Sequence, residues 1–302
     1  MIIIPDGVLG FLPFEILKDE NGKYLIEKYN IKYTQSMGVL DIIEKRKYPG
    51  SRKPMLAFGG AVYDEVRYSV DMADTEIKVA ALEKNIFTSF ENQRSVRNAY
   101  ASLDMAKWTN LPGTLSEVSD IASIIPEAEV IKGNSVTENR IKELSARGDL
   151  SKYKVIHFAT HGLVVQEVPE LSAIVLSQFK KEKEGEDGYL RMNEISELNI
   201  KADFVNLSAC ETGLGKIYGG EGVVGLTQSF LIAGANGLSV SLWQVADDST
   251  SNFMVAMYKA VNEQGLGYSE AINKVKRRFI KGDFGKTYQA PYYWAPFVYY
   301  GK

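Results

Sequence analysis

The sequence predicts an α/β fold, an αβα sandwich built on a mostly parallel central sheet. Short apolar runs bounded by turn-forming residues alternate with longer segments whose apolar residues recur at helical spacing. The clearest unit covers residues 203–245, where an apolar run, a glycine-rich loop, a helical pattern and a second apolar run follow one another. Units of this kind build parallel sheets in which the carboxyl ends of the strands share one edge.

The same two patterns assign most of the remaining chain. Apolar runs predict strands over residues 53–60, 129–132, 154–160, 173–177, 203–209, 238–245 and 297–300. Helical spacing predicts helices over residues 71–87, 137–145, 193–198, 221–233, 248–261 and 269–279, and one more that begins at a cap, Thr114 or Ser116, with Glu117 in its first turn. Residues 2–17 predict a hairpin-like opening, whereas residues 92–110 have mixed polarity and predict no element.

Composition places the chain among ordinary globular proteins. It has 302 residues, 45% of them hydrophobic and 24% charged, with a formal net charge of -3. This charge gives no reason to expect nucleic acid or an anionic membrane as a partner. A single cysteine cannot form an internal disulfide, no apolar run reaches the length of about 20 residues that spans a bilayer, and no signal peptide is evident. A cytoplasmic location is therefore expected.

Two reactive side chains follow two of the predicted strands. Cys210, the only cysteine, comes directly after the strand at 203–209, and His161 comes directly after the strand at 154–160. A thiol is a weak nucleophile until a base favours its thiolate, and an imidazole supplies that base. The pair therefore suggests a Cys-His hydrolase at the carboxyl edge of the sheet.

The other histidine, His157, lies inside its strand between two apolar residues. We expect it to be a hydrogen-bonded structural histidine, with a supporting role beside the site as the alternative. His157 and His161 do not predict a metal site. Four residues along a strand rise about 13 Å, so the two imidazoles cannot share one ion. No metal and no cofactor is expected.

The glycine-rich loop permits a nucleotide-binding interpretation, which its spacing does not support. Gly213 and Gly215 are followed by Tyr218, where the dinucleotide fingerprint requires glycine, and no Ser or Thr follows Lys216 as in a P-loop. The sequence also lacks the GxSxG turn of serine hydrolases.

Four ordered motifs resemble the CHAT family of caspase-like cysteine peptidases, which are related to separase. They are HFATHG at 157–162, LSACETG at 207–213, GEGVVGL at 220–226 and SLWQVADDST at 241–250, and the likeness extends over essentially the whole chain. The resemblance implies a caspase-like sandwich with Cys210 as nucleophile and His161 as general base. It also implies an oxyanion hole made by the backbone N–H groups of Gly162 and Cys210.

The acidic residues near the predicted site have two interpretations. By resemblance to separase-like enzymes, Asp247 would accept an Arg or Lys side chain before the cleaved bond, with Asp248 and Glu211 as further substrate-binding candidates. The alternative is that Asp247 and Asp248 cap the helix that follows them. Glu211 adjoins Cys210 and would then only shape the pocket.

The expected function is a cytoplasmic cysteine endopeptidase that acts as a regulated proteolytic switch on a partner protein. Its alternative is a non-catalytic, caspase-like interaction scaffold. Residues 1–110 are expected to form the N-terminal part of the CHAT region and residues 111–302 its catalytic core. By resemblance, the chain would belong to a longer protein with N-terminal helical repeats, and a role in prokaryotic defence would be typical. The charge-dense run 180–188 is expected to be solvated surface or, alternatively, an activation loop.

Overall fold

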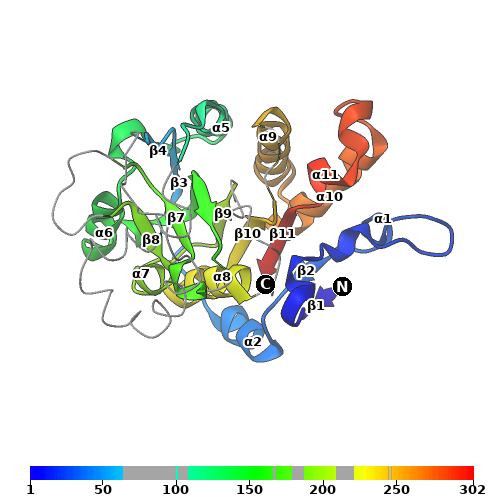
Figure 1. Cartoon of the computed structure of the whole chain (residues 1–302), viewed down its shortest axis with the longest axis horizontal. Helices are drawn as coiled ribbons and strands as arrows, with labels where there is room; N and C mark the ends of the chain where they lie inside the picture. The colour runs from blue at the N-terminus through cyan, green and yellow to red at the C-terminus, as the bar shows by residue number, and fades with distance from the viewer. Residues whose placement is uncertain are drawn as a thin grey trace, which may run out of the picture.

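An eight-stranded sheet forms the centre of the computed structural model, which describes residues 1–63, 100, 108–165, 168–178, 187–208, 221–243, 245 and 247–302. The strand order is β1-β2-β11-β10-β9-β5-β3-β4 (Figure 1). The strands are β1 (Ile2–Ile3), β2 (Lys32–Tyr33), β3 (Lys53–Gly59), β4 (Glu129–Lys132), β5 (Tyr153–Ala159), β9 (Phe204–Leu207), β10 (Gly237–Ser241) and β11 (Phe297–Gly301).

The five strands from β4 to β10 are mutually parallel, while β11 pairs antiparallel to β10. Strands β2 and β1 continue the sheet parallel to β11. The carboxyl ends of β3, β5, β9 and β10 therefore share one edge. The prediction of a mostly parallel α/β sheet is confirmed.

Helices cover both faces of this sheet (Figure 1). One face carries α2 (Met37–Lys45), α6 (Glu138–Ala146), α7 (Met192–Ser196) and α8 (Glu221–Ala233), and the other carries α5 (Pro112–Ile124), α9 (Asp247–Gln264) and α10 (Tyr268–Lys281), with short helices α1 (Leu25–Lys28) and α11 (Pro291–Trp294) beside α10. Each face has its own apolar core. Ile156 and Phe158 of β5 enter the first, and Val155 and Ala159 enter the second, as strand alternation requires.

A small antiparallel sheet lies at the carboxyl edge of the large one. It consists of β6 (His161–Leu163), β7 (Ala173–Val175) and β8 (Tyr189–Arg191) in the order β6-β7-β8. Only Thr160 separates β5 from β6, so His161 stands at the junction of the two sheets. The sequence predicted only the middle strand, within the apolar run 173–177; strands of three residues are too short for alternation to be recognised.

Two predictions are wrong: the start of helix α5 and the hairpin at the beginning of the chain. Helix α5 begins at Pro112, not at a Thr114 or Ser116 cap, because proline fits the first helical position. Thr114 instead accepts a hydrogen bond from the Gly60 N–H at 3.0 Å and donates one to the Leu111 carbonyl at 2.7 Å. The opening is no hairpin, since β1 pairs in parallel with β2. The predicted helix 71–87 lies outside the described residues.

The charge-dense run 180–188 is described only at its end. Residues 180–186 lie outside the described part, whereas Asp187 is 2% exposed and pairs with Arg191. Oε2 of the buried Glu138 accepts the N–H groups of Asp187 and Gly188, both at 3.1 Å. This end is therefore anchored in the protein and is not solvated surface.

Buried polar contacts fix the N-terminal residues to α10. The Lys276 Nζ lies 2.6 Å from Glu15 Oε1, and both side chains are buried. The amide of Asn273 accepts from the Ile31 N–H at 2.8 Å and donates to the Ile31 carbonyl at 2.9 Å. Residues from the two ends of the sequence thus form one unit with the sheet. No described helix combines the length and the apolar character needed to span a membrane.

Candidate functional site

The strands that precede His161 and Cys210 are direct neighbours. Strands β5 and β9 pair in parallel, with Phe158 opposite Leu207, and the Ser208 N–H donates to the Phe158 carbonyl at 3.0 Å. His161 follows Phe158 by three residues, and Cys210 follows Leu207 by three residues. Cys210 and Glu211 lie outside the described residues. The two strand ends are nevertheless adjacent at the carboxyl edge of the described sheet.

The His161 ring is held by a backbone carbonyl. Its Nε2 lies 2.7 Å from the carbonyl oxygen of Thr109, and the residue is 1% exposed. A carbonyl oxygen can only accept, so Nε2 carries the hydrogen in this contact. In the neutral imidazole, Nδ1 is then the basic nitrogen.

Aromatic side chains hold both the ring and the segment that contacts it. The rings of Tyr63 and Trp108 lie 5.0 and 4.9 Å from the His161 ring, centroid to centroid. The Trp108 indole N–H donates to the Tyr189 hydroxyl at 3.0 Å, and the Asn110 side chain accepts from the Tyr63 N–H at 2.8 Å. Contacts with Tyr189 of β8 and with Tyr63, four residues after β3, therefore position the Thr109 carbonyl.

Gly162, the predicted oxyanion-hole residue, is buried in β6 opposite Ile174. A narrow void beside it is bounded by Phe158, Thr160, His161, Gly162, Ile174, Leu207 and Leu226. Most of the side chains around this void are apolar, and His161 and Thr160 are its polar members. The oxyanion role of the Gly162 N–H stays a prediction.

The predicted substrate carboxylates lie at the start of α9. This helix begins at Asp247, whose side chain is outside the described residues, and it follows β10, the neighbour of β9. Asp248 is exposed and accepts from the Ser249 N–H at 2.9 Å and from the Tyr288 hydroxyl. The latter hydrogen bond raises the pKa of Tyr288. Asp248 therefore serves as a local acceptor at the helix start, and substrate binding by either aspartate stays a prediction.

His157 belongs to a buried network on the face of β5 that helices α5 and α9 cover. Its Nδ1 lies 3.0 Å from the Tyr258 hydroxyl and 3.1 Å from the Asn206 amide nitrogen, and both groups can donate to it. Its Nε2 lies 3.0 Å from Glu117 Oε1, within ion-pair distance although not aligned as a hydrogen bond. His157 and Glu117 are 0% and 3% exposed. The expected structural role fits these contacts, and Asn206 links β5 to β9 directly beneath the two strand ends.

The sequence predicted Glu117 as a charge in the first turn of a helix, whereas the structure buries it beside His157. A stability measurement can test whether this contact stabilises the fold. Glu117→Leu is expected to lower the free energy of unfolding by about 1–3 kcal/mol, because it leaves a buried ring N–H without its acidic partner. Glu117→Gln keeps an oxygen acceptor and should cost less. Urea denaturation at pH 7 measures both variants. Equal losses would show that packing, not the contact with His157, determines the effect.

Sequence patterns could not have identified Thr109 or Trp108 as parts of the site. Both lie in the segment 92–110, which has no periodic pattern, and Thr109 acts through its backbone, which any residue provides. The signal that the sequence did offer was the likeness of essentially the whole chain to a known family.

The mostly parallel sheet with helices on both faces makes this an α/β protein. Its candidate site lies at the carboxyl ends of the strands, where a backbone carbonyl orients the buried His161. The family model of the CHAT domain matches residues 1–302 of the sequence, so the chain belongs to the CHAT domain family. The resemblance of the four motifs is thereby confirmed.

Individual relatives are distant. Tetratricopeptide repeat protein 28 of Homo sapiens is 21% identical over 337 residues, an alignment that covers 100% of this chain and 12% of that protein. A Saccharomyces cerevisiae separase–securin complex aligns with 13% identity and a TM-score of 0.47, covering 96% of this chain and 15% of that chain. The Arg specific cysteine proteinase gingipain R aligns with 8% identity and a TM-score of 0.44, and the alignment covers 90% of this chain and 54% of that chain. The chain thus spans a small part of the curated relative that it matches.

Proposed function

We propose that this CHAT domain is a cysteine endopeptidase in which Cys210 is the nucleophile and His161 is the general base. The observation that carries the proposal is the contact between His161 Nε2 and the Thr109 carbonyl at 2.7 Å. This contact leaves Nδ1 as the base at the end of the strand next to β9. Cys210 follows Ser208, the last described residue of that segment, by two residues, and two residues span at most about 7 Å.

In the proposed reaction, the Cys210 thiol gives its proton to Nδ1 of His161, and the sulfur adds to the carbonyl carbon of the peptide bond. The N–H groups of Gly162 and Cys210 would hold the resulting oxyanion, a contribution of typically a few kcal/mol for each donor. Cleavage of the C–N bond leaves a thioester, and the imidazolium returns its proton to the leaving amine. Water, deprotonated by Nδ1, then releases the acid and restores the thiol.

The Thr109 carbonyl would be the orienting group in this mechanism. It fixes the ring and stabilises the imidazolium through the Nε2–H hydrogen bond, a role that a third side chain often fulfils in related arrangements. The ring is then already oriented, so proton transfer costs no further conformational entropy of the ring.

We further propose that Asp247 accepts a basic side chain before the cleaved bond, as the resemblance implies. A carboxylate at this edge would pair with an Arg or Lys side chain. Asp247→Ala is expected to reduce kcat/KM for Arg and Lys substrates at least tenfold and to leave that for a Leu substrate nearly unchanged. An unchanged preference in a folded variant would refute the assignment, and Lys45→Ala, on the exposed face of α2, serves as the control.

Turnover of a fluorogenic peptide panel tests the proposal, with Arg, Lys, Asp, Leu or Met before the reporter and Cys210→Ala beside the wild type. Turnover that disappears in the variant supports the peptidase. Absence of turnover together with an unreactive Cys210 would instead favour the non-catalytic scaffold.

The proposed substrate is a segment of a partner protein, cut as a regulated switch. The name of the human relative refers to tetratricopeptide repeats, which supports a helical-repeat region as a further partner. A role in prokaryotic defence and a cytoplasmic location remain parts of this proposal.

A further inference from the structure

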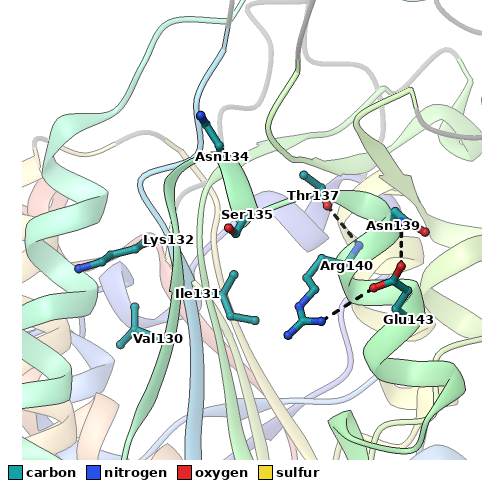
Figure 2. Close-up of a pocket in the computed structure, with 9 residues that line it drawn as sticks. All are labelled: Val130, Ile131, Lys132, Asn134, Ser135, Thr137, Asn139, Arg140 and Glu143. Carbon is teal, nitrogen blue, oxygen red and sulfur yellow. Dashed lines mark hydrogen bonds and ion pairs between the residues drawn. The ribbon is translucent and has the colours of Figure 1, made fainter. Parts of the chain in front are cut away.

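A groove of about 570 Å³ runs between strand β4 and helix α6, at the far end of the sheet from β1 (Figure 2). Three consecutive residues of β4, Val130, Ile131 and Lys132, contribute to its lining. Figure 2 shows Ile131 pointing toward α6, while Val130 and Lys132 point away from it. Because neighbouring side chains of a strand point to opposite faces, a groove lined by all three follows the edge of the strand.

Among the described residues, β4 is the last strand of the sheet, and no described strand pairs with its outer edge. In the described part of the chain, β4 pairs with β3 alone, through residues Glu129 to Lys132. An edge strand presents backbone N–H and C=O groups that a further extended segment can pair with. A groove between an edge strand and a helix is a geometry in which peptides bind by strand addition.

Two of the three charged residues that line the groove are basic. Arg140 of α6 reaches into the groove toward Ile131 (Figure 2) and is 41% exposed. Its ion pair with Glu143 is long, at 3.8 Å, and the other oxygen of Glu143 accepts from the Asn139 amide at 3.0 Å. Lys132 is exposed at the end of β4.

The acidic residue of the strand does not offset this charge. Glu129 Oε1 lies 2.5 Å from Lys53 Nζ, and Glu129 Oε2 accepts from the Tyr153 hydroxyl at 2.7 Å. These contacts lower the pKa of Glu129, so the carboxylate stays ionised and engaged. An incoming segment would therefore meet two cations, Arg140 and Lys132, and one carboxylate, Glu143, which the Asn139 amide and Arg140 contact.

We propose that this groove binds an extended acidic segment of a partner protein, which adds as a strand beside β4. The backbone hydrogen bonds of the added strand provide affinity, and an acidic side chain on the α6 face pairs with Arg140. Strand β3 separates β4 from β5, so this docking site is distinct from the site at His161. The inference does not depend on peptidase activity.

Fluorescence polarisation of labelled eight-residue peptides with the full chain tests the proposal. The peptides alternate valine and threonine and carry a central Glu, Gln or Lys. We expect the Glu peptide to bind most tightly and the Lys peptide least. Arg140→Glu should weaken binding of the Glu peptide at least tenfold and reverse the preference, because it replaces a charge-assisted pair by repulsion. Arg278→Glu, with a similar exposure of 43% on α10, is the matched control and should change nothing.

A peptide-side variant tests the strand addition without altering the protein. N-methylation of alternate backbone amides in the Glu peptide, in both registers, should abolish binding in one register. Binding that survives both would overturn strand addition, as would absence of binding by every peptide at 1 mM. Self-association of the chain that Arg140→Glu abolishes would also overturn the proposal, because a second copy would then occupy the groove.

Discussion

His161→Ala is expected to lower peptide turnover by about 10²–10⁴-fold. The variant removes the base that would take the Cys210 proton, and general acid–base catalysis typically contributes a factor of this size. The Thr109 carbonyl cannot replace the base, since it only accepts hydrogen bonds. Steady-state rates with the preferred fluorogenic peptide measure the effect, and the loss should lie in kcat more than in KM.

Two checks separate this loss from a folding defect. His161 contacts Tyr63 and Trp108, so the variant must keep the denaturation midpoint of the wild type within a small shift. Added imidazole should restore part of the rate, because the missing group is a base. Turnover within threefold of wild type in a folded His161→Ala protein would contradict the assignment of the base.

Lys276→Met is expected to destabilise the protein by about 3–5 kcal/mol. The side chain of Lys276 is 0% exposed and pairs with Glu15, so the variant leaves an uncompensated carboxylate in the core. Burial itself lowers the pKa of Lys276, and Glu15 opposes that effect by favouring the charged form. Urea denaturation measures the change in the free energy of unfolding.

The exposed pair of Lys45 and Asp41 supplies the matched control. Lys45 lies 2.5 Å from Asp41, with side chains 72% and 60% exposed, and exposed ion pairs contribute about 0–1 kcal/mol. Lys45→Met should therefore change stability little. A Lys276→Met protein as stable as Lys45→Met would show that the N-terminal residues are not held to α10 as described.

Periodic patterns predicted the parts of the fold that depend on local sequence. The strand 129–132 and the helix 221–233 occur with the predicted bounds, because each combines a clear pattern with glycine or turn residues at its ends. The placement of the ends of β5 and β9 at the carboxyl edge was likewise expected, because strands of such units run parallel.

Contacts between distant segments could not be predicted in this way. Thr109 reaches His161 across 52 residues, and Glu15 reaches Lys276 across 261 residues. Neither pair leaves a periodic signal, because each depends on the folded arrangement of elements. The burial of Glu117 could not be predicted for the same reason. A charge at a helix start and a buried partner of His157 have the same local sequence pattern.

The most direct test of the proposed peptidase is the site and rate of covalent labelling by a peptidyl acyloxymethyl ketone, followed by mass spectrometry of the intact chain and its fragments. We expect one label, on Cys210, that forms rapidly in the wild type and at least a hundredfold more slowly in His161→Ala. A folded wild-type protein that takes no label, or a label that forms equally fast without His161, would contradict the Cys-His mechanism.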